Sequence, residues 1–173
     1  MKRALVLGTL TLVPIAIVAH AEVYMSDEAA VQSIFPSDKF VRREISLTPD
    51  QIATIQKNTS DVHSSTLHTF VNPKKDLVFI DQVLGKHELI TIAVGVDHDG
   101  SVKGIEILEY RETYGSQVRG AAWRRQFVGK TASSDLKLGS DIKNISGATL
   151  SSAHITAAVK RLVRTYDTIQ AEL

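Results

Sequence analysis

Four consecutive segments with the composition of β-strands, joined only by short turns, constrain the fold of this chain more than any other feature. They cover residues 67–71, 77–83, 88–96 and 102–110. Turn-forming residues separate them at Asn72-Pro73, Leu84-Gly85-Lys86 and Asp97-His98-Asp99-Gly100. Strands that follow one another through such short turns pair in opposite directions. The pattern therefore predicts an antiparallel sheet.

A long amphipathic helix is expected near the C-terminus. From Leu150 to Ile169, apolar residues recur at helical spacing and charged residues fall mostly between them. Another helix is expected from Ser116 to Phe127, with Trp123 and Phe127 on one face and in the core. These two helices would cover one face of the sheet. The arrangement predicts an α+β fold, an antiparallel sheet covered by helices, in a single domain.

The region before these strands contains shorter elements. Residues 26–34 form a short helical pattern that ends before Pro36, and residues 40–47 form a strand-like segment. In Thr48-Pro49-Asp50, a capping residue precedes a proline at the first helical position. We therefore expect a second short helix, which ends near Asn58, and then a polar loop.

Composition excludes several kinds of chemistry. The chain has no cysteine, so it has no disulfide, thiolate nucleophile or cysteine-ligated iron–sulfur cluster. With 20 Lys and Arg against 19 Asp and Glu, its charge is close to neutral, which argues against nucleic acid as a partner. The histidines after residue 60 lie in separate elements without metal-ligand spacing, so we predict no metal site. His98, between Asp97 and Asp99, is expected at a hairpin tip in contact with water.

The first residues have the pattern of a cleaved secretory signal. Lys2 and Arg3 precede an apolar run from Ala4 to Ala19, and Ala19-His20-Ala21 matches the small-x-small cleavage pattern. The run is shorter than the ~20 apolar residues of a membrane-spanning helix. We therefore expect a signal peptide at residues 1–21 and a periplasmic or otherwise extracytoplasmic location after cleavage. An uncleaved membrane anchor is the alternative.

The octapeptide from Ile145 to Ser152 reads Ile-Ser-Gly-Ala-Thr-Leu-Ser-Ser and lies at the start of the C-terminal helix. The first N–H groups of a helix have no intrahelical partner and carry a partial positive charge, so they attract anions. Gly147 allows the chain to turn and a ligand to approach the backbone. The sequence therefore predicts a phosphate site at Thr149. The alternative is that Ser146, Thr149 or Ser151 only caps the helix.

Residues Ser146-Gly147-Ala148-Thr149-Leu150-Ser151 resemble the flavinylation motif of the FMN-binding domain family, which occurs in one subunit each of the sodium-pumping NADH:quinone oxidoreductase and the Rnf complex. In that family the threonine forms a phosphoester with FMN, attached by a flavin transferase that uses FAD and magnesium. The resemblance implies that Thr149 is the attachment residue. It also implies cofactor contacts at its neighbours Ser146, Gly147, Ala148, Leu150 and Ser151. One difference is Lys143, because the family often has an acidic residue six positions before the threonine.

A second stretch, from Val94 to Val128, resembles the family's strand, turn, strand and Glu-Thr-x-Gly segment, which a helix with tryptophan and phenylalanine follows. The resemblance implies an FMN-binding domain at residues 66–173, preceded by a helical and strand extension at residues 22–65. It also implies that the turn Glu112-Thr113-Tyr114-Gly115 lies against the flavin ring. The alternative is a turn in which Glu112 and Thr113 cap the following helix.

The resemblance predicts an exported electron-transfer flavoprotein. FMN held covalently through Thr149 would receive electrons from a membrane-bound reductase or cytochrome and deliver them to an extracytoplasmic acceptor. The sequence has no recognisable catalytic set, so we interpret the chain as an electron carrier or as part of a redox system rather than as a stand-alone enzyme. The flavin transferase is the expected maturation partner. The alternative is a non-redox exported module for assembly or ligand binding, with the same fold and no flavin.

Overall fold

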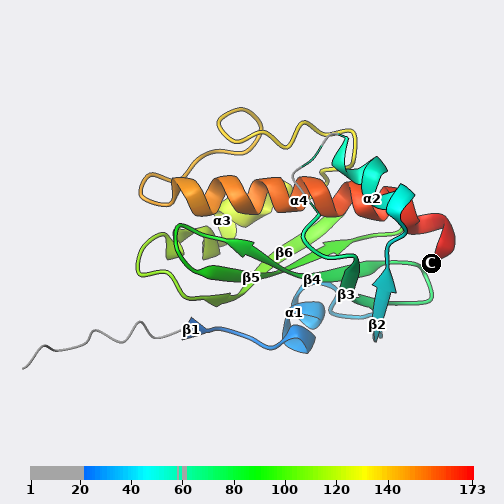
Figure 1. Cartoon of the computed structure of the whole chain (residues 1–173). Helices are drawn as coiled ribbons and strands as arrows, with labels where there is room; N and C mark the ends of the chain where they lie inside the picture. The colour runs from blue at the N-terminus through cyan, green and yellow to red at the C-terminus, as the bar shows by residue number, and fades with distance from the viewer. Residues whose placement is uncertain (1–21, 58, 60–61) are drawn as a thin grey trace, which may run out of the picture.

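Within residues 22–57, 59 and 62–173, which the computed structural model describes, the chain forms one antiparallel sheet of six strands (Figure 1). The signal peptide expected at residues 1–21 lies outside the described residues. The strands are β1 (Glu22–Val23), β2 (Val41–Ser46), β3 (Thr66–Val71), β4 (Leu77–Leu84), β5 (Leu89–Val96) and β6 (Val102–Tyr110). Their order across the sheet is β1-β6-β5-β4-β3-β2.

The four predicted strands are confirmed as β3 to β6, and the consecutive strands among them pair antiparallel. The two edge strands come from the segment before them. β2 pairs with β3 along its whole length, whereas β1 pairs with the end of β6, where Glu22 lies opposite Tyr110. The N-terminal segment 22–65 therefore supplies both edges of the sheet.

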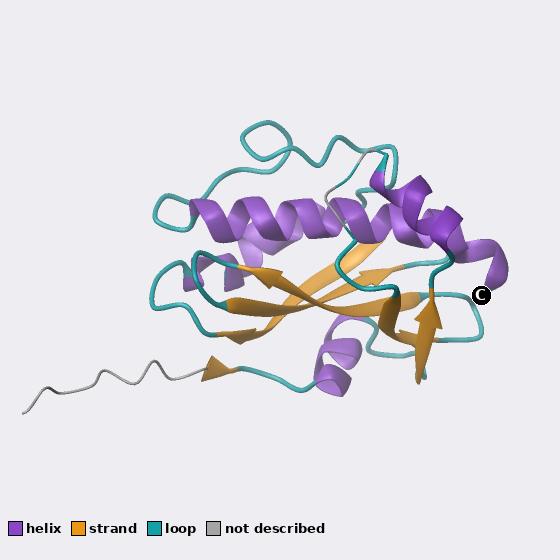
Figure 2. Ribbon diagram, viewed as in Figure 1, coloured by secondary structure: helices purple, strands orange, loops and turns teal. Residues whose placement is uncertain are grey.

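Helices cover both faces of this sheet (Figures 1 and 2). The α-helices are α1 (Asp27–Ile34), α2 (Pro49–Gln56), α3 (Ala121–Arg124) and α4 (Thr149–Ile169), and the 3-10 helices are η1 (Ser116–Arg119), η2 (Arg125–Phe127) and η3 (Gln170–Glu172). The long α4 lies along one face, and α1 lies against the other. The predicted α+β fold is confirmed. In the described part of the chain, no helix combines the length and apolar composition needed to cross a membrane.

The alternation of side chains along the strands creates two separate cores. Phe79 and Ile92 point toward α4 and belong to the larger core, whereas their neighbours Val78 and Ala93 point to the opposite face. There they pack with Val31 of α1. The central strands are thus buried on both sides, which fixes their register and holds the ends of the strands in place.

The two short N-terminal helices begin as the sequence predicts. The Ser26 hydroxyl accepts a hydrogen bond from the Ala29 N–H at 3.2 Å. Thr48 caps α2, and its side chain and that of Gln51 form a reciprocal capping box, with Pro49 at the first helical position. Local sequence alone therefore fixes where both helices start.

The single helix predicted from Ser116 to Phe127 is wrong. The segment consists of η1, α3 and η2, because Gly120 between η1 and α3 has φ −57° and ψ 123°, outside the helical region. The predicted core role of Trp123 and Phe127 is confirmed. Their rings meet edge to face at 5.0 Å between centroids, and both are buried.

The prediction that water is the partner of His98 is also wrong. The Asp76 carboxylate accepts a hydrogen bond from the His98 N–H at 2.8 Å and lies 3.1 Å from its Nδ1 atom. The hydrogen bond to Asp76 and the charge of Asp99 raise the pKa of His98. Burial alone would raise the pKa of Asp76, but hydrogen bonds from Asn72 and His98 outweigh burial and lower it.

This contact predicts a pH-dependent stability. Because the folded pKa of His98 lies above its ordinary value of 6.5, the stabilisation is present below that pH and is lost as pH rises through the folded pKa. We expect the free energy of unfolding, measured with urea from pH 6 to 8.5, to fall by less in His98→Gln than in the wild type. Equal slopes in the wild type and His98→Gln would contradict this prediction.

Candidate functional site

The predicted start of the C-terminal helix is confirmed, because α4 begins at Thr149. Its N-cap is Ala148, and no side chain makes a capping hydrogen bond. The interpretation of Ser146, Thr149 or Ser151 as a simple cap is therefore wrong. The first backbone bond of the helix runs from the Ser152 N–H to the Ala148 carbonyl at 2.8 Å. The turn before Ser152 thus presents backbone donors at the positive end of a 21-residue helix.

The chain approaches this helix start through a tight turn. The Ala148 N–H donates to the Ile145 carbonyl at 3.0 Å, and Gly147 has φ +84°, a conformation that favours glycine. Ser146, Gly147 and Thr149 are exposed, whereas Ala148 is buried. The motif thus lies on the surface and is anchored by one small buried residue.

Thr149 is exposed, and its hydroxyl has a hydrogen-bond partner among the described residues. The Asn144 side-chain amide donates a hydrogen bond to the Thr149 Oγ1 atom at 3.2 Å. Sequence reasoning did not identify Asn144. The sequence signal that could have identified Asn144 is its position, five residues before Thr149 and next to the unusual Lys143. The Lys143 backbone bonds to the Gln126 and Trp123 side chains.

The second predicted motif, the turn from Glu112 to Gly115, lies directly against the start of α4. The buried Tyr110 hydroxyl donates to the Tyr114 carbonyl at 2.6 Å and lies 3.1 Å from the Ser151 hydroxyl oxygen. Gly115 has φ +98°, and a Cβ atom there would lie 2.5 Å from the Tyr110 hydroxyl oxygen. The structure therefore brings together two motifs that are more than 30 residues apart.

The alternative in which Glu112 and Thr113 cap the following helix is wrong. Gly115 is the N-cap of η1, and no side chain caps it. Glu112 instead accepts hydrogen bonds from the backbone N–H groups of His87 and Glu88 in the β4–β5 turn. Burial alone would raise the pKa of Glu112, but these backbone hydrogen bonds outweigh burial and lower it, so the group is held as a carboxylate.

The β4–β5 turn is the third segment at this site, and the sequence did not point to it. His154 of α4 uses Nδ1 to contact the carbonyl oxygens of Leu84 and Gly85, the latter at 3.1 Å. Two carbonyl acceptors require that Nδ1 carry the proton. His154 therefore fastens α4 to the turn that Glu112 also contacts.

Exposed apolar side chains gather in these three segments. Tyr114 is 83% exposed, Leu84 53%, Leu150 47% and Leu89 42%. The start of α4 thus combines backbone donors with an exposed threonine, Thr149, and an exposed leucine, Leu150.

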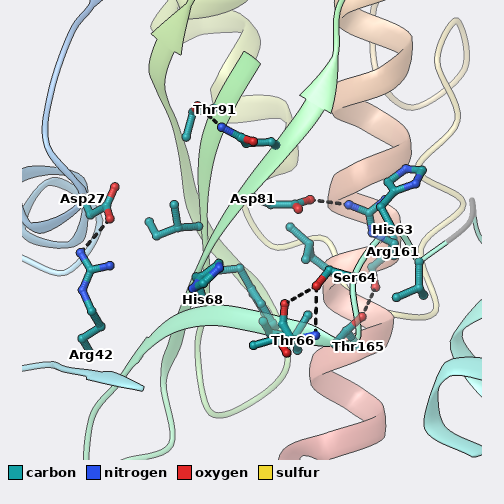
Figure 3. A pocket seen from close by; sticks show the side chains of 16 residues that line it. Asp27, Arg42, His63, Ser64, Thr66, His68, Asp81, Thr91, Arg161 and Thr165 are labelled. Carbon is teal, nitrogen blue, oxygen red and sulfur yellow. Dashed lines mark hydrogen bonds and ion pairs between the residues drawn. The ribbon is translucent and has the colours of Figure 1, made fainter. Parts of the chain in front are cut away.

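A separate cavity of about 540 Å³ lies where β3 and β4 diverge (Figure 3). β3 pairs with β4 only as far as Ile80, so Asp81 and the residues after it lack a partner on that side. Figure 3 shows two ion pairs at the cavity, Asp81 with Arg161 and Asp27 with Arg42. Arg161 is twelve residues beyond Thr149, about 18 Å along a helix. The cavity is therefore distinct from the site at Thr149.

These features define a class of protein. Proteins often bind phosphate groups at a helix start that lies beside an exposed hydroxyl and has no side-chain cap. Within the described residues, no three His, Cys, Asp or Glu side chains come close enough together to hold a metal ion.

A comparison with known proteins finds a matching family. Residues 85–164 match the model of the FMN-binding domain family. This match agrees with the resemblance to the FMN-binding domain family that the sequence motifs indicate. The matched segment contains all three segments of the site except Leu84.

The curated relatives are components of redox complexes, and each is the component designated G. That of the ion-translocating oxidoreductase complex from Aliivibrio fischeri is 37% identical over 95 residues, 49% of this chain and 45% of that protein. Its counterpart from Shewanella oneidensis is 33% identical over 95 residues, with the same coverage. That of the Na(+)-translocating ferredoxin:NAD(+) oxidoreductase complex from Acetobacterium woodii is 30% identical over 89 residues, 46% of this chain and 43% of that protein. The matched region spans less than half the length of these relatives.

Proposed function

We propose that this chain is an exported electron-transfer flavoprotein that carries FMN as a phosphoester on Thr149. The observation that carries the proposal is the exposed Thr149 hydroxyl at the first residue of α4, where no side chain caps the helix. A covalent bond suits a carrier outside the cytoplasm, because a dissociated cofactor would diffuse away. When bound, FMN supplies a group that accepts and donates electrons.

The residues of the site suit the two ends of this cofactor. The backbone N–H groups of Leu150 and Ser151, at the positive end of α4, are placed to hold a phosphodiester. The turn from Glu112 to Gly115 offers backbone polar groups and the exposed Tyr114 ring, which would hydrogen-bond and stack with the flavin. Leu150 adds an apolar contact beside the attachment point.

Attachment requires a second protein in this proposal. A flavin transferase with magnesium would bring FAD to Thr149. The Thr149 oxygen would form a bond to the phosphorus on the FMN side, the pyrophosphate bond would break, and AMP would leave with the electron pair. The hydroxyl proton would pass to a base of the transferase or to water. Asn144 would orient the attacking oxygen through its 3.2 Å hydrogen bond.

The redox partners of the chain are proposed from its relatives. These relatives are named as components of ion-translocating oxidoreductase complexes, which supports a membrane-bound reductase or a cytochrome as the electron donor. The extracytoplasmic location rests on the signal-peptide pattern before Glu22. In the second candidate function, a non-redox assembly or ligand-binding module, the same fold carries no flavin, and Lys143 at the usual acidic position favours it.

The test is expression of the whole chain in a host with and without the flavin transferase, followed by intact mass and visible absorbance. The proposal expects a mass gain of one FMN less one water and a yellow protein only when the transferase is present. Peptide mapping should place the added mass on the peptide that contains Thr149. An unmodified, colourless chain in both hosts would support the non-redox module instead.

Gly147→Val is expected to slow attachment at least ~10-fold, because a β-branched residue resists the positive φ that Gly147 adopts and the turn before Thr149 would rearrange. The measurement is the rate of FMN incorporation in vitro with purified transferase and FAD. Gly129→Val is the matched control. Its φ is +78°, a Cβ there also meets nothing within 4 Å, and its N–H donates to the carbonyl of Val102, the first residue of β6. Equal rates in the two variants would contradict the role given to the Gly147 turn.

A further inference from the structure

The Tyr110 hydroxyl occupies the junction between the two sequence motifs. Its ring belongs to the larger core and the residue is only 2% exposed, at the last position of β6. Its hydroxyl group touches one partner on each side, the Tyr114 carbonyl at 2.6 Å and the Ser151 hydroxyl at 3.1 Å. Burial raises the pKa of Tyr110, so the hydroxyl stays protonated and continues to donate.

The backbone of the Glu112–Gly115 turn lies so close to the Tyr110 hydroxyl that no side chain fits between them at Gly115. A Cβ on Gly115 would lie 2.5 Å from the Tyr110 oxygen, 3.3 Å from the Ser151 oxygen and 3.4 Å from the Ala148 Cβ. Only glycine fits at that distance and at φ +98°. The backbone of the turn therefore rests on the Tyr110 hydroxyl and on the first turn of α4.

Three polar contacts close a cycle around the site. Tyr110 joins the Glu112–Gly115 turn to α4, Glu112 joins that turn to the β4–β5 turn, and His154 joins the β4–β5 turn back to α4. In a closed cycle each contact limits the movement that the other two would allow. Of the residues in this cycle, Tyr110 is the one whose hydroxyl donates to the backbone of the Glu112–Gly115 turn beside the start of α4.

We propose that Tyr110 is a positioning residue: its hydroxyl holds the Glu112–Gly115 turn against the start of α4 and thereby sets the reduction potential of FMN carried on Thr149. The inference rests on the proposed function and adds a residue that sets the reduction potential at the same site. Backbone groups that hydrogen-bond to the polar edge of a flavin tune its potential, and their effect depends on where they are held. Tyr110 acts through the turn and does not itself contact the ring.

The test replaces one hydroxyl at a time. Tyr110→Phe keeps the buried ring and removes both hydrogen bonds. Tyr166→Phe is the matched control, because Tyr166 is also buried in the larger core and its hydroxyl donates to the Lys75 carbonyl at 2.9 Å, near the other end of α4. Both variants lose one buried hydroxyl, so a general loss of stability would appear in both.

The first readout is amide hydrogen exchange of protein without FMN, followed by mass spectrometry. We expect exchange in residues 112–118 and at the start of α4 to be about fivefold faster in Tyr110→Phe, the factor that corresponds to one lost hydrogen bond. Tyr166→Phe should leave these segments unchanged. The second readout is the ratio of oxidised to reduced FMN at equilibrium with a reference dye. In Tyr110→Phe that carries FMN, this ratio should differ about fivefold from that of the wild type. In Tyr166→Phe it should stay within about twofold of the wild type.

The outcomes separate this proposal from the proposed function. If exchange and dye equilibrium are the same in the two variants and the wild type, the proposal is overturned even when FMN is attached. If the wild type gains no FMN mass, the proposed function fails, and the exchange measurement still decides whether Tyr110 holds the turn. Should Tyr110→Phe not fold, Ser151→Ala removes the other partner of the same contact and should move exchange at the start of α4 in the same direction. No change in Ser151→Ala would then overturn the proposal.

Discussion

Thr149→Ala is expected to abolish covalent flavin attachment. The exposed hydroxyl is the proposed nucleophile, and alanine removes it without touching the core. The fold should persist, because the Thr149 side chain makes one hydrogen bond, at 3.2 Å from Asn144, and surface changes of this kind alter stability by about 0.5 kcal/mol or less. After co-expression with the transferase, the variant should have the unmodified mass and no visible absorbance, while its thermal unfolding matches the wild type.

Two controls make this result specific. Thr149→Ser keeps an alcohol and should retain partial modification, whereas Ser146→Ala removes a nearby exposed hydroxyl and should be modified like the wild type. If Thr149→Ala still gained the mass of FMN less water, the attachment site would lie elsewhere and the roles given to the start of α4 would have to be abandoned. Loss of modification in Ser146→Ala alone would point to that serine instead.

Gly115→Ala is expected to destabilise the protein more than any other single methyl group added at the site. A left-handed φ of +98° costs a non-glycine residue about 1–2 kcal/mol, and the new Cβ would lie 2.5 Å from the Tyr110 hydroxyl oxygen. Overpacking of this kind typically adds about 1–3 kcal/mol. We therefore expect a loss of ~3 kcal/mol in the free energy of unfolding, measured by urea denaturation.

The two causes can be separated. Gly129→Ala has a similar φ of +78° and nothing within 4 Å of the added Cβ, so it should show only the backbone cost. In a Tyr110→Phe background the hydroxyl is absent, and Gly115→Ala should cost about 1 kcal/mol less than in the wild type. If Gly115→Ala destabilised the protein no more than Gly129→Ala, the close packing of the turn on Tyr110 would be refuted.

Elements set by local sequence were predictable. The strands β3 to β6 follow from apolar segments between turn residues, and the caps at Ser26 and Thr48 fix the starts of α1 and α2. The start of α4 at Thr149 was also correct. The prediction of one helix across residues 116–127 was wrong because it gave more weight to the amphipathic pattern than to Gly120. In the structure, the backbone of Gly120 leaves the helical region and divides the segment.

The contacts that join the site were beyond local reasoning. Tyr110 and Ser151 are 41 residues apart, Glu112 and Glu88 are 24 apart, and His154 and Gly85 are 69 apart. No periodicity or motif pairs such residues, because their proximity depends on how the sheet and α4 pack. The motif at Thr149 and the turn at Glu112 could be recognised separately, but their shared packing on one tyrosine hydroxyl required the fold.

The helix-cap alternative shows why spacing alone was ambiguous. Ser146, Thr149 and Ser151 are all residues that cap helices, and the sequence did not distinguish a cap from a ligand site. In the structure the N-cap is Ala148, Ser151 contacts Tyr110, and Thr149 accepts from Asn144. The residue at the N-cap position is thus alanine, which has no polar side-chain atom with which to cap the helix.

The pairing of β1 and β2 with opposite ends of the sheet bears on protein engineering. The segment that matches the family model starts at residue 85, in the turn after β4. A fragment trimmed to that match would lack β4, which pairs with β5 along its whole length. It would also lack β1, which pairs with β6. Bare strand edges of this kind recruit other chains and promote aggregation. A miniaturised version intended for bioelectronic use should therefore retain the chain from Glu22 onward.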